Sequence, residues 1–177
     1  MYEGLLLSTG GGIITDLKKS AQQGEPTIII GLGGTGVDAL KVVKKKVYEQ
    51  LMPDNPDAAV PEYKRIGFLA IDTDDIDTGD GDNNFYHLEG TECLSIKVPG
   101  LNEKMKTDIK NKEKEFVWLQ PRLDLHGVDG AGTIRQVGRY SVFKNIDAIT
   151  AKLISLKTAV TIGTGKPNVN VHILAGI

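Results

Sequence analysis

The stretch of sequence that decides the fold is Thr27-Ile28-Ile29-Ile30-Gly31-Leu32-Gly33-Gly34-Thr35-Gly36. Its first four residues form an unbroken β-branched run, which is typical of a strand buried on both faces of a parallel sheet. The glycines that follow suit a backbone that has to turn sharply. Apolar residues then recur at helical spacing from Val37 to Leu51. This stretch therefore predicts a strand, a tight turn and an amphipathic helix.

The glycine turn is placed where an anion would be stabilised. We expect the helix to begin near Gly36, so that its free N–H groups and the positive end of its dipole face the turn. The hydroxyl of Thr35 adds a further donor. Glycines also let the backbone approach the oxygen atoms of a ligand closely. The sequence thus predicts a phosphate site formed by Gly31, Gly33, Gly34, Thr35 and Gly36.

Outward from this stretch, strand-like and helix-like segments alternate. Strands are expected at 66–71, 93–98 and 169–177, and helices at 102–115 and from 134 to about 156. This order predicts an α/β fold with an open, mostly parallel, Rossmann-like sheet and flanking helices. The last segment reads as a buried strand that stops without a cap or polar tail. We therefore expect a fragment whose sheet is truncated after its fourth strand.

A second group of polar residues follows the strand expected at 66–71. Asp72, Thr73 and Asp74 stand at its carboxyl end, where ligands bind in open α/β sheets. A carboxylate there would contact either a nucleotide ribose or a hydrated magnesium ion. The aspartates continue to Asp82, but Ile76 stands where a calcium loop needs a ligand and no glutamate closes the loop. We expect a solvated surface loop, and no metal site built from protein ligands alone.

A second glycine turn, Gly130-Ala131-Gly132-Thr133, precedes the helix that carries Arg135 and Arg139. These arginines stand one helical turn apart, so both can point back to a ligand, with a surface ion pair as the alternative for Arg135. A dinucleotide-binding fold does not require such a turn before its third helix. A triphosphate benefits from it, because the concentrated charge of the terminal phosphate favours a second ring of N–H donors. We therefore expect Gly130, Ala131, Gly132 and Thr133 to share one nucleotide with the first turn.

Composition excludes several classes of function. The chain has 177 residues and a formal net charge of -2, so nothing draws it as a whole to nucleic acid or to an anionic membrane. It has no apolar run of the ~20 residues that a membrane span needs. Its single cysteine, Cys93, is expected to be a core thiol and fits a reducing cytoplasm. Lys41, Lys44, Lys45 and Lys46 are expected to form a solvated helix face.

The three motifs, in this order, resemble the tubulin/FtsZ superfamily, most closely its bacterial tubulin-like proteins. Gly31–Gly36 resembles the first glycine loop, and Ile71-Asp72-Thr73-Asp74 resembles the Asn-Thr-Asp of FtsZ. Residues 130–139 resemble the Gly-Ala-Gly-Gly-Asn-Pro-Glu-x-Gly-Arg of FtsZ in length, in order and in the closing Gly-Arg. The resemblance covers residues 26–177. It implies an N-terminal extension at 1–25, followed by the N-terminal part of a tubulin-like nucleotide-binding domain.

The resemblance also implies a function and a set of contacts. The glycine turns would hold the phosphates of GTP or GDP, Asp72, Thr73 and Asp74 would line the phosphate and magnesium side, and Gln136 and Arg139 would approach the ribose. Magnesium would be held through phosphates and water. Asp72 stands where the family motif has Asn, and Gln136 stands where the family motif has Glu. The intact cytoskeletal protein would assemble head to tail and hydrolyse GTP at the junctions, while this fragment alone would be a poor GTPase.

Two other functions stay open at this point. The pattern Gly31-x-Gly33-x-x-Gly36, with Asp72 closing the second strand, also fits an NAD- or FAD-binding Rossmann enzyme. The acid of that fingerprint is expected about 20 residues on, however, and Asp72 lies well beyond. The other alternative is a tubulin-fold assembly module that does not catalyse hydrolysis.

Overall fold

The computed structural model describes residues 25–51, 65–78, 87–111, 114–119 and 134–176. The strands are β1 (Thr27–Leu32), β2 (Ile66–Asp72), β3 (Cys93–Ser95) and β4 (Asn170–Ala175). The helices are α2 (Gly33–Leu51), the short 3₁₀ helix η2 (Gly90–Glu92), α3 (Leu101–Asn111), α4 (Arg135–Lys144) and α5 (Ile146–Thr161). Apart from Glu25, the predicted N-terminal extension at 1–25 lies outside the described residues.

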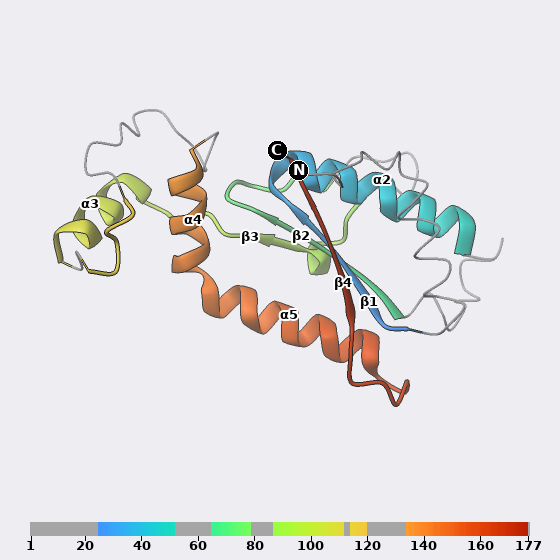
Figure 1. The fold of residues 1–177 in the computed structure, drawn as a ribbon. Coiled ribbons are helices and arrows are strands. Elements are labelled where there is room, and N and C mark those ends of the chain that lie inside the picture. The colour runs from blue at the N-terminus through green and yellow to red at the C-terminus, as the bar shows by residue number, and fades with distance from the viewer. Residues whose placement is uncertain (1–24, 52–64, 79–86, 112–113, 120–133, 177) are drawn as a thin grey trace, which may run out of the picture.

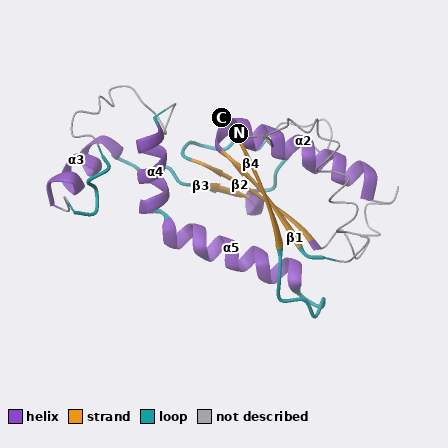
Figure 2. Ribbon diagram, in the orientation of Figure 1, coloured by secondary structure: helices purple, strands orange, loops and turns teal. Residues whose placement is uncertain are grey.

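The described strands form one open sheet in the order β3-β2-β1-β4, and each neighbouring pair is parallel (Figure 2). β1 lies between β2 and β4, with Ile29 opposite Phe68 on one side and His172 on the other. Side chains from Thr27 to Ile30 are buried, as the β-branched run predicted. The predicted α/β class and the Rossmann-like parallel sheet are confirmed.

Helices cover both faces of the sheet (Figure 1). α2 packs on one face, where Ile29 and Phe68 meet Leu40 and Val47. α5 packs on the other face, where Ile28, with other alternate residues of β1 and β2, meets helix residues such as Ile149 and Val160. Alternate residues of a strand point to opposite faces, so the continuous apolar runs of β1 and β2 supply both layers.

β4 is a half-exposed strand, which corrects the expectation of a buried one. Among the described strands it pairs only with β1, and its residues alternate between half-buried and exposed. Val171 and Ile173 are 53% and 62% exposed, whereas Leu174, on the other face, packs against the cluster beneath α2. An apolar run does not reveal whether its strand lies in the middle of a sheet or at its edge, because that depends on which strands pair with it.

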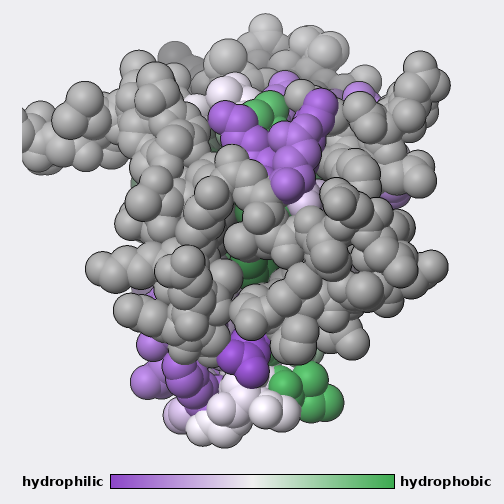
Figure 3. Space-filling view, turned by 90° about the vertical axis from the view of Figure 1, so that its right-hand side faces the viewer, coloured by the Kyte–Doolittle hydropathy of each residue, from purple (hydrophilic) through white to green (hydrophobic). Residues whose placement is uncertain are grey.

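The surface seen in Figure 3 is mainly hydrophilic where its residues are described. An exposed apolar group lies at its lower edge, the end of the molecule where α5 leads into β4. Ile162, in the turn between these two elements, is 79% exposed. In the parts of the chain that the structure describes, no helix is long and apolar enough to cross a bilayer.

The single helix expected from 134 to about 156 is two helices, α4 and α5, which meet at Asn145. The Asn145 side-chain amide donates to the carbonyl oxygen of Ser141 at 2.8 Å and to that of Ile96 at 3.1 Å. An asparagine that bonds nearby backbone competes with the helical hydrogen bonds, so a bend there is expected. Because of the bend, α4 leaves the face of the sheet that α5 covers (Figure 1).

α4 is held beside the sheet by a small core of its own. Val137 and Tyr140 of α4 pack with Met105 of α3 and with Phe116. The Tyr140 hydroxyl donates to a carboxylate oxygen of Asp108 at 2.8 Å. Burial first, and then the Asp108 carboxylate, raise the pKa of Tyr140, so this phenol stays a neutral donor. These contacts fix the position of α4 next to the carboxyl ends of the strands.

Lys44 of α2 is buried, which corrects the expectation that Lys41, Lys44, Lys45 and Lys46 form a solvated face. Its side chain is 2% exposed and its ammonium lies 2.6 Å from a carboxylate oxygen of Glu92. The ammonium also donates to the carbonyl oxygen of His87 at 3.0 Å. A charge can be buried when it is paired and hydrogen-bonded, and the segment that leads into β3 supplies both partners.

Two other expected elements, β3 and α3, form with shorter bounds than expected, while part of the expected acidic surface loop lies outside the described residues. β3 ends at Ser95 rather than at residue 98, and α3 ends at Asn111 rather than at residue 115. Cys93 is half-buried against the cluster beneath α2, as expected of a core thiol. Burial, followed by the neighbouring Glu92 carboxylate, raises the pKa of Cys93.

Candidate functional site

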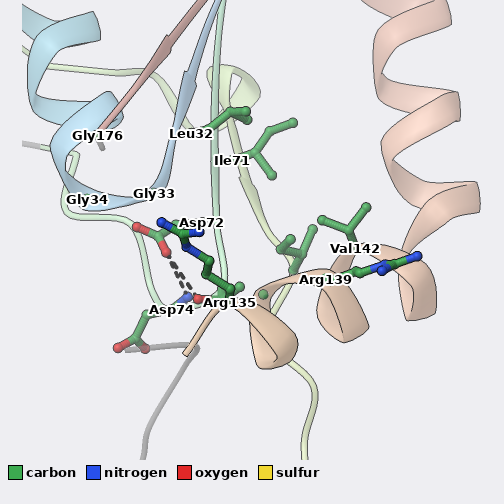
Figure 4. A pocket seen from close by; sticks show the side chains of 13 residues that line it. Leu32, Gly33, Gly34, Ile71, Asp72, Asp74, Arg135, Arg139, Val142 and Gly176 are labelled. Atoms are coloured by element: carbon green, nitrogen blue, oxygen red, sulfur yellow. Dashed lines mark hydrogen bonds between the residues drawn. The ribbon is translucent and has the colours of Figure 1, made fainter. Parts of the chain in front are cut away.

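The candidate site is an open pocket at the carboxyl ends of the strands, between the start of α2 and the start of α4 (Figure 4). Its volume is about 690 Å³. That lies within the roughly 300–1,000 Å³ typical of small-molecule sites. After β1 the chain places β2 and then β3 on one side of β1, and it later places β4 on the other side. The pocket thus lies at a topological switch point, where open α/β sheets bind their ligands.

The glycine turn forms one wall of this pocket, through Gly33 and Gly34. α2 begins at Gly33 rather than near Gly36, so Gly33, Gly34 and Gly36 lie in its first turn. Gly33 has a φ of 68°, which only glycine adopts without strain, and this makes the tight junction between strand and helix possible. A Cβ added to Gly34 would meet no atom of the described residues within 4 Å. The backbone of this turn is therefore open to a ligand.

Gly31 and Gly36 have a different role, because neither lines the pocket. A Cβ on Gly31 would lie 2.5 Å from the carbonyl oxygen of Gly36, and a Cβ on Gly36 would overlap the carbonyl oxygen of Leu174. These two glycines let α2 pack directly against β1 and β4. Thr35 is exposed and lies against Gly176, which follows β4 and lines the pocket.

The electrostatics of the α2 start favour an anion. Its first turn carries no acidic residue, so no side-chain charge there neutralises the partial positive charge of the helix N-terminus. The nearest acid along the helix, Asp38, lies 3.8 Å from the ammonium of Lys41. Free N–H groups at such a terminus are natural partners for phosphate oxygens.

Asp72, Thr73 and Asp74 also line the pocket, at the end of β2. A carboxylate oxygen of Asp72 accepts from the N–H of Asp74 at 3.3 Å and from the Thr73 hydroxyl at 3.4 Å (Figure 4). This local bonding closes the turn after β2. The Asp74 carboxylate lies 3.2 Å from the ammonium of Lys97. The N–H of Asp75, and then Lys97, lower the pKa of Asp74, so Asp74 is ionised.

α4 forms the facing wall, through Arg135, Gly138 and Arg139. The Arg135 side chain extends towards the end of β2, whereas that of Arg139 points away from it (Figure 4). The Arg139 guanidinium lies 4.3 Å from the centroid of the Trp118 ring, a cation–π contact. α4 therefore offers the pocket one arginine and turns the other outward.

Between these polar groups lies an apolar surface made by Leu32, Ile71, Ile96 and Val142. Leu32 and Val142 are 37% and 42% exposed, while Ile71 and Ile96 are buried. An apolar wall of this kind beside a few polar groups is the usual composition of a ligand site.

A family model described as tubulin like matches residues 28–177, which is more than half of the chain. The chain belongs to the tubulin-like family. The resemblance drawn from the three motifs is thereby confirmed at the level of that family. No curated protein and no solved structure matches the chain significantly.

For this tubulin-like chain, the structure brings together two of the three predicted motifs. Gly33 and Gly34 share a pocket with Asp72, Thr73 and Asp74, although the two groups are separated by more than thirty positions in the sequence. The third motif is only partly described, since Gly130, Ala131, Gly132 and Thr133 lie outside the described residues. Arg139 borders the pocket, and Gln136 is not among the described residues that line it.

Several residues around the pocket were not predicted from the sequence, namely Leu32, Ile71, Ile96, Gly138, Val142 and Gly176. The apolar ones carry no motif, and only the tertiary fold shows that their exposed parts meet. The spacing of Arg135 and Arg139, one helical turn apart, indicated that both can point towards a ligand, but only Arg139 was assigned to the site. Within the described residues, no group of three or more His, Cys, Asp or Glu side chains could hold a metal ion.

Proposed function

We propose that this pocket binds a guanine nucleotide, GTP or GDP, through its phosphates. The observation that carries the proposal is the open wall formed by Gly33 and Gly34 at the start of α2. Membership of the tubulin-like family supports it, because the corresponding glycine turn of the tubulin/FtsZ superfamily holds the phosphates of GTP. The pocket volume of about 690 Å³ is large enough for a nucleotide.

The residues present fit a polyphosphate. The first turn of α2 has no side chain at Gly33 or Gly34 to keep phosphate oxygens from the backbone N–H groups. The absence of an acid in that turn leaves the attraction of the helix dipole for the phosphates intact. The apolar surface of Leu32 and Val142 suits the less polar, nucleoside part of the ligand.

The residues also fit a magnesium ion held through phosphates and water. Asp72 is the better candidate to orient a water of its hydration shell, since Asp74 is already paired with Lys97. When bound, the ion would neutralise charge on the phosphate oxygens. Asp72 would then act as an acceptor at the edge of the site, with one carboxylate oxygen fixed by Asp74 and Thr73.

The first test compares nucleotides and one glycine substitution. We expect GTP and GDP to raise the thermal unfolding temperature of the protein in the presence of Mg²⁺, and NAD to have a much smaller effect. Gly34→Ala should weaken GTP binding by about tenfold or more, a loss of about 1.4 kcal/mol, because its methyl group would stand between phosphate and backbone. Isothermal titration calorimetry would measure the dissociation constant of GTP for the unsubstituted protein and for Gly34→Ala.

The matched control for this test is Gly90→Ala. A Cβ at Gly90, like one at Gly34, would meet no atom within 4 Å in the part of the chain that the structure describes, and Gly90 does not line the pocket. Gly90→Ala should therefore bind GTP as the unsubstituted protein does. If Gly34→Ala also binds GTP normally, the glycine turn does not hold the phosphates. If NAD stabilises the protein more than GTP, the dinucleotide-binding alternative is favoured instead.

We further propose that the tubulin-like protein assembles head to tail and that assembly is coupled to GTP hydrolysis. This step rests on family membership, since the superfamily completes its hydrolytic site between subunits. We expect right-angle light scattering to rise when GTP and Mg²⁺ are added, and to rise much less with GDP. Equal scattering with GTP, GDP or no nucleotide would contradict the coupling and favour a non-catalytic assembly module.

A further inference from the structure

The two arginines of α4 stand one helical turn apart, and the structure gives them different surroundings. Arg139 stacks on the ring of Trp118, with its guanidinium 4.3 Å from the ring centroid. Arg135 extends into the pocket, towards the end of β2 and the Gly33–Gly34 wall (Figure 4). The arginine that faces the pocket is therefore not the one that the family motif singles out.

The acidic side chains at this end of the sheet already have hydrogen-bond partners of their own. Asp74 is paired with Lys97 at 3.2 Å, and Lys97 also lies 3.3 Å from Asp75. One oxygen of Asp72 accepts from Thr73 and Asp74. Arg135 is exposed, and its pocket is bounded on the far side by the α2 N-terminus, which carries partial positive charge.

Two positive features thus face one space from opposite sides. We propose that Arg135 binds the phosphate groups of the ligand from the α4 side, while the N–H groups of α2 bind them from the other side. This inference rests on the proposed nucleotide function and names a side chain for it. A guanidinium is planar, remains charged at any relevant pH and donates two parallel hydrogen bonds to one phosphate group.

The same arrangement predicts which part of the ligand Arg135 recognises. The apolar residues Leu32 and Val142 offer a surface to a nucleoside but no charge. Removal of Arg135 should therefore weaken the binding of phosphorylated ligands and leave the binding of an uncharged nucleoside unchanged. A purely structural role in α4 would affect both kinds of ligand equally.

The test measures dissociation constants for GTP, GDP, guanosine and inorganic tripolyphosphate with the unsubstituted protein and with Arg135→Gln. We expect about 10- to 100-fold weaker binding of the three anions, as for the loss of a charge-assisted hydrogen-bonding group, and no change for guanosine. The dissociation constants of Arg135→Lys for the three anions should fall between those of the unsubstituted protein and of Arg135→Gln. Lysine keeps the positive charge but loses the planar fork of N–H donors. Urea unfolding should show that both variants retain their stability, since Arg135 is exposed.

The matched control is Lys157→Gln, which removes one positive charge from the exposed surface of α5, outside the residues that line the pocket. It should change the four constants by less than about twofold, because screening suppresses distant surface charges. If Arg135→Gln binds GTP and tripolyphosphate as tightly as Lys157→Gln, the role of Arg135 is wrong while nucleotide binding stands. If tripolyphosphate binds through Arg135 but GTP does not bind, the proposed function fails and the anion site remains. If no anion binds the unsubstituted protein, both proposals fall.

Discussion

Gly36→Ala is expected to destabilise this protein by about 3 kcal/mol, at the upper end of what overpacking costs. The added Cβ would overlap the carbonyl oxygen of Leu174 in β4 and would lie 3.2 Å from its carbonyl carbon. Both are backbone atoms of a paired strand, so neither can rotate away as the end of a side chain would. α2 would have to move off the sheet, and Leu40, which is fully buried beneath it, would lose packing.

Gly34→Ala is the matched comparison for stability, because it places the same methyl group two residues earlier in the same helical turn. Among the described residues its Cβ would meet no atom within 4 Å, and alanine is a better helix former than glycine by about 1 kcal/mol. Urea unfolding at neutral pH should therefore give a lower midpoint for Gly36→Ala and an unchanged or higher midpoint for Gly34→Ala. Equal midpoints would show that the close approach of α2 to β4 is not needed for stability.

Lys44→Met should have a similarly large effect, a loss of about 3 kcal/mol. Methionine fills much of the same volume, but it leaves the Glu92 carboxylate, which is 16% exposed, without its cation. It also removes the donor to the carbonyl oxygen of His87. The Glu92 carboxylate keeps its hydrogen bond from the N–H of Glu89, which limits the loss. The change should be visible as a lower urea midpoint.

Two further variants separate the ion pair from the packing. Lys44→Met combined with Glu92→Gln should recover at least about 1 kcal/mol, because the neutral amide no longer leaves a buried charge unpaired. Lys45→Met removes a neighbouring lysine that is 27% exposed and 3.7 Å from Glu49, and should cost less than about 0.5 kcal/mol. Strict additivity of the Lys44 and Glu92 substitutions would contradict a coupled pair.

Local patterns in the sequence were sufficient to predict the main strands and helices, and to predict which residues form two walls of the candidate pocket. The β-branched run of β1 and the helical spacing of α2 are properties of neighbouring residues, and both elements form, although α2 begins three residues earlier than expected. The placement of Asp72 beside Gly33 followed from a general rule, that the carboxyl ends of parallel strands meet at one edge. Bounds were less accurate where a side chain acts on the backbone, as Asn145 does between α4 and α5.

The sequence by itself determined the α/β class, the glycine turn between β1 and α2 and the resemblance to the tubulin-like family, because the spacing of glycines and of apolar residues is a property of neighbouring residues. Only the tertiary structure decided that Lys44 is buried, that β4 is half-exposed beside β1, and that Arg135 rather than Arg139 faces the pocket. Each of these depends on a partner remote in the chain. Lys44 meets Glu92 across 48 positions, and Arg139 is turned outward by Trp118. The orientation of a side chain is set by the atoms packed around it, and its own sequence neighbours do not specify them.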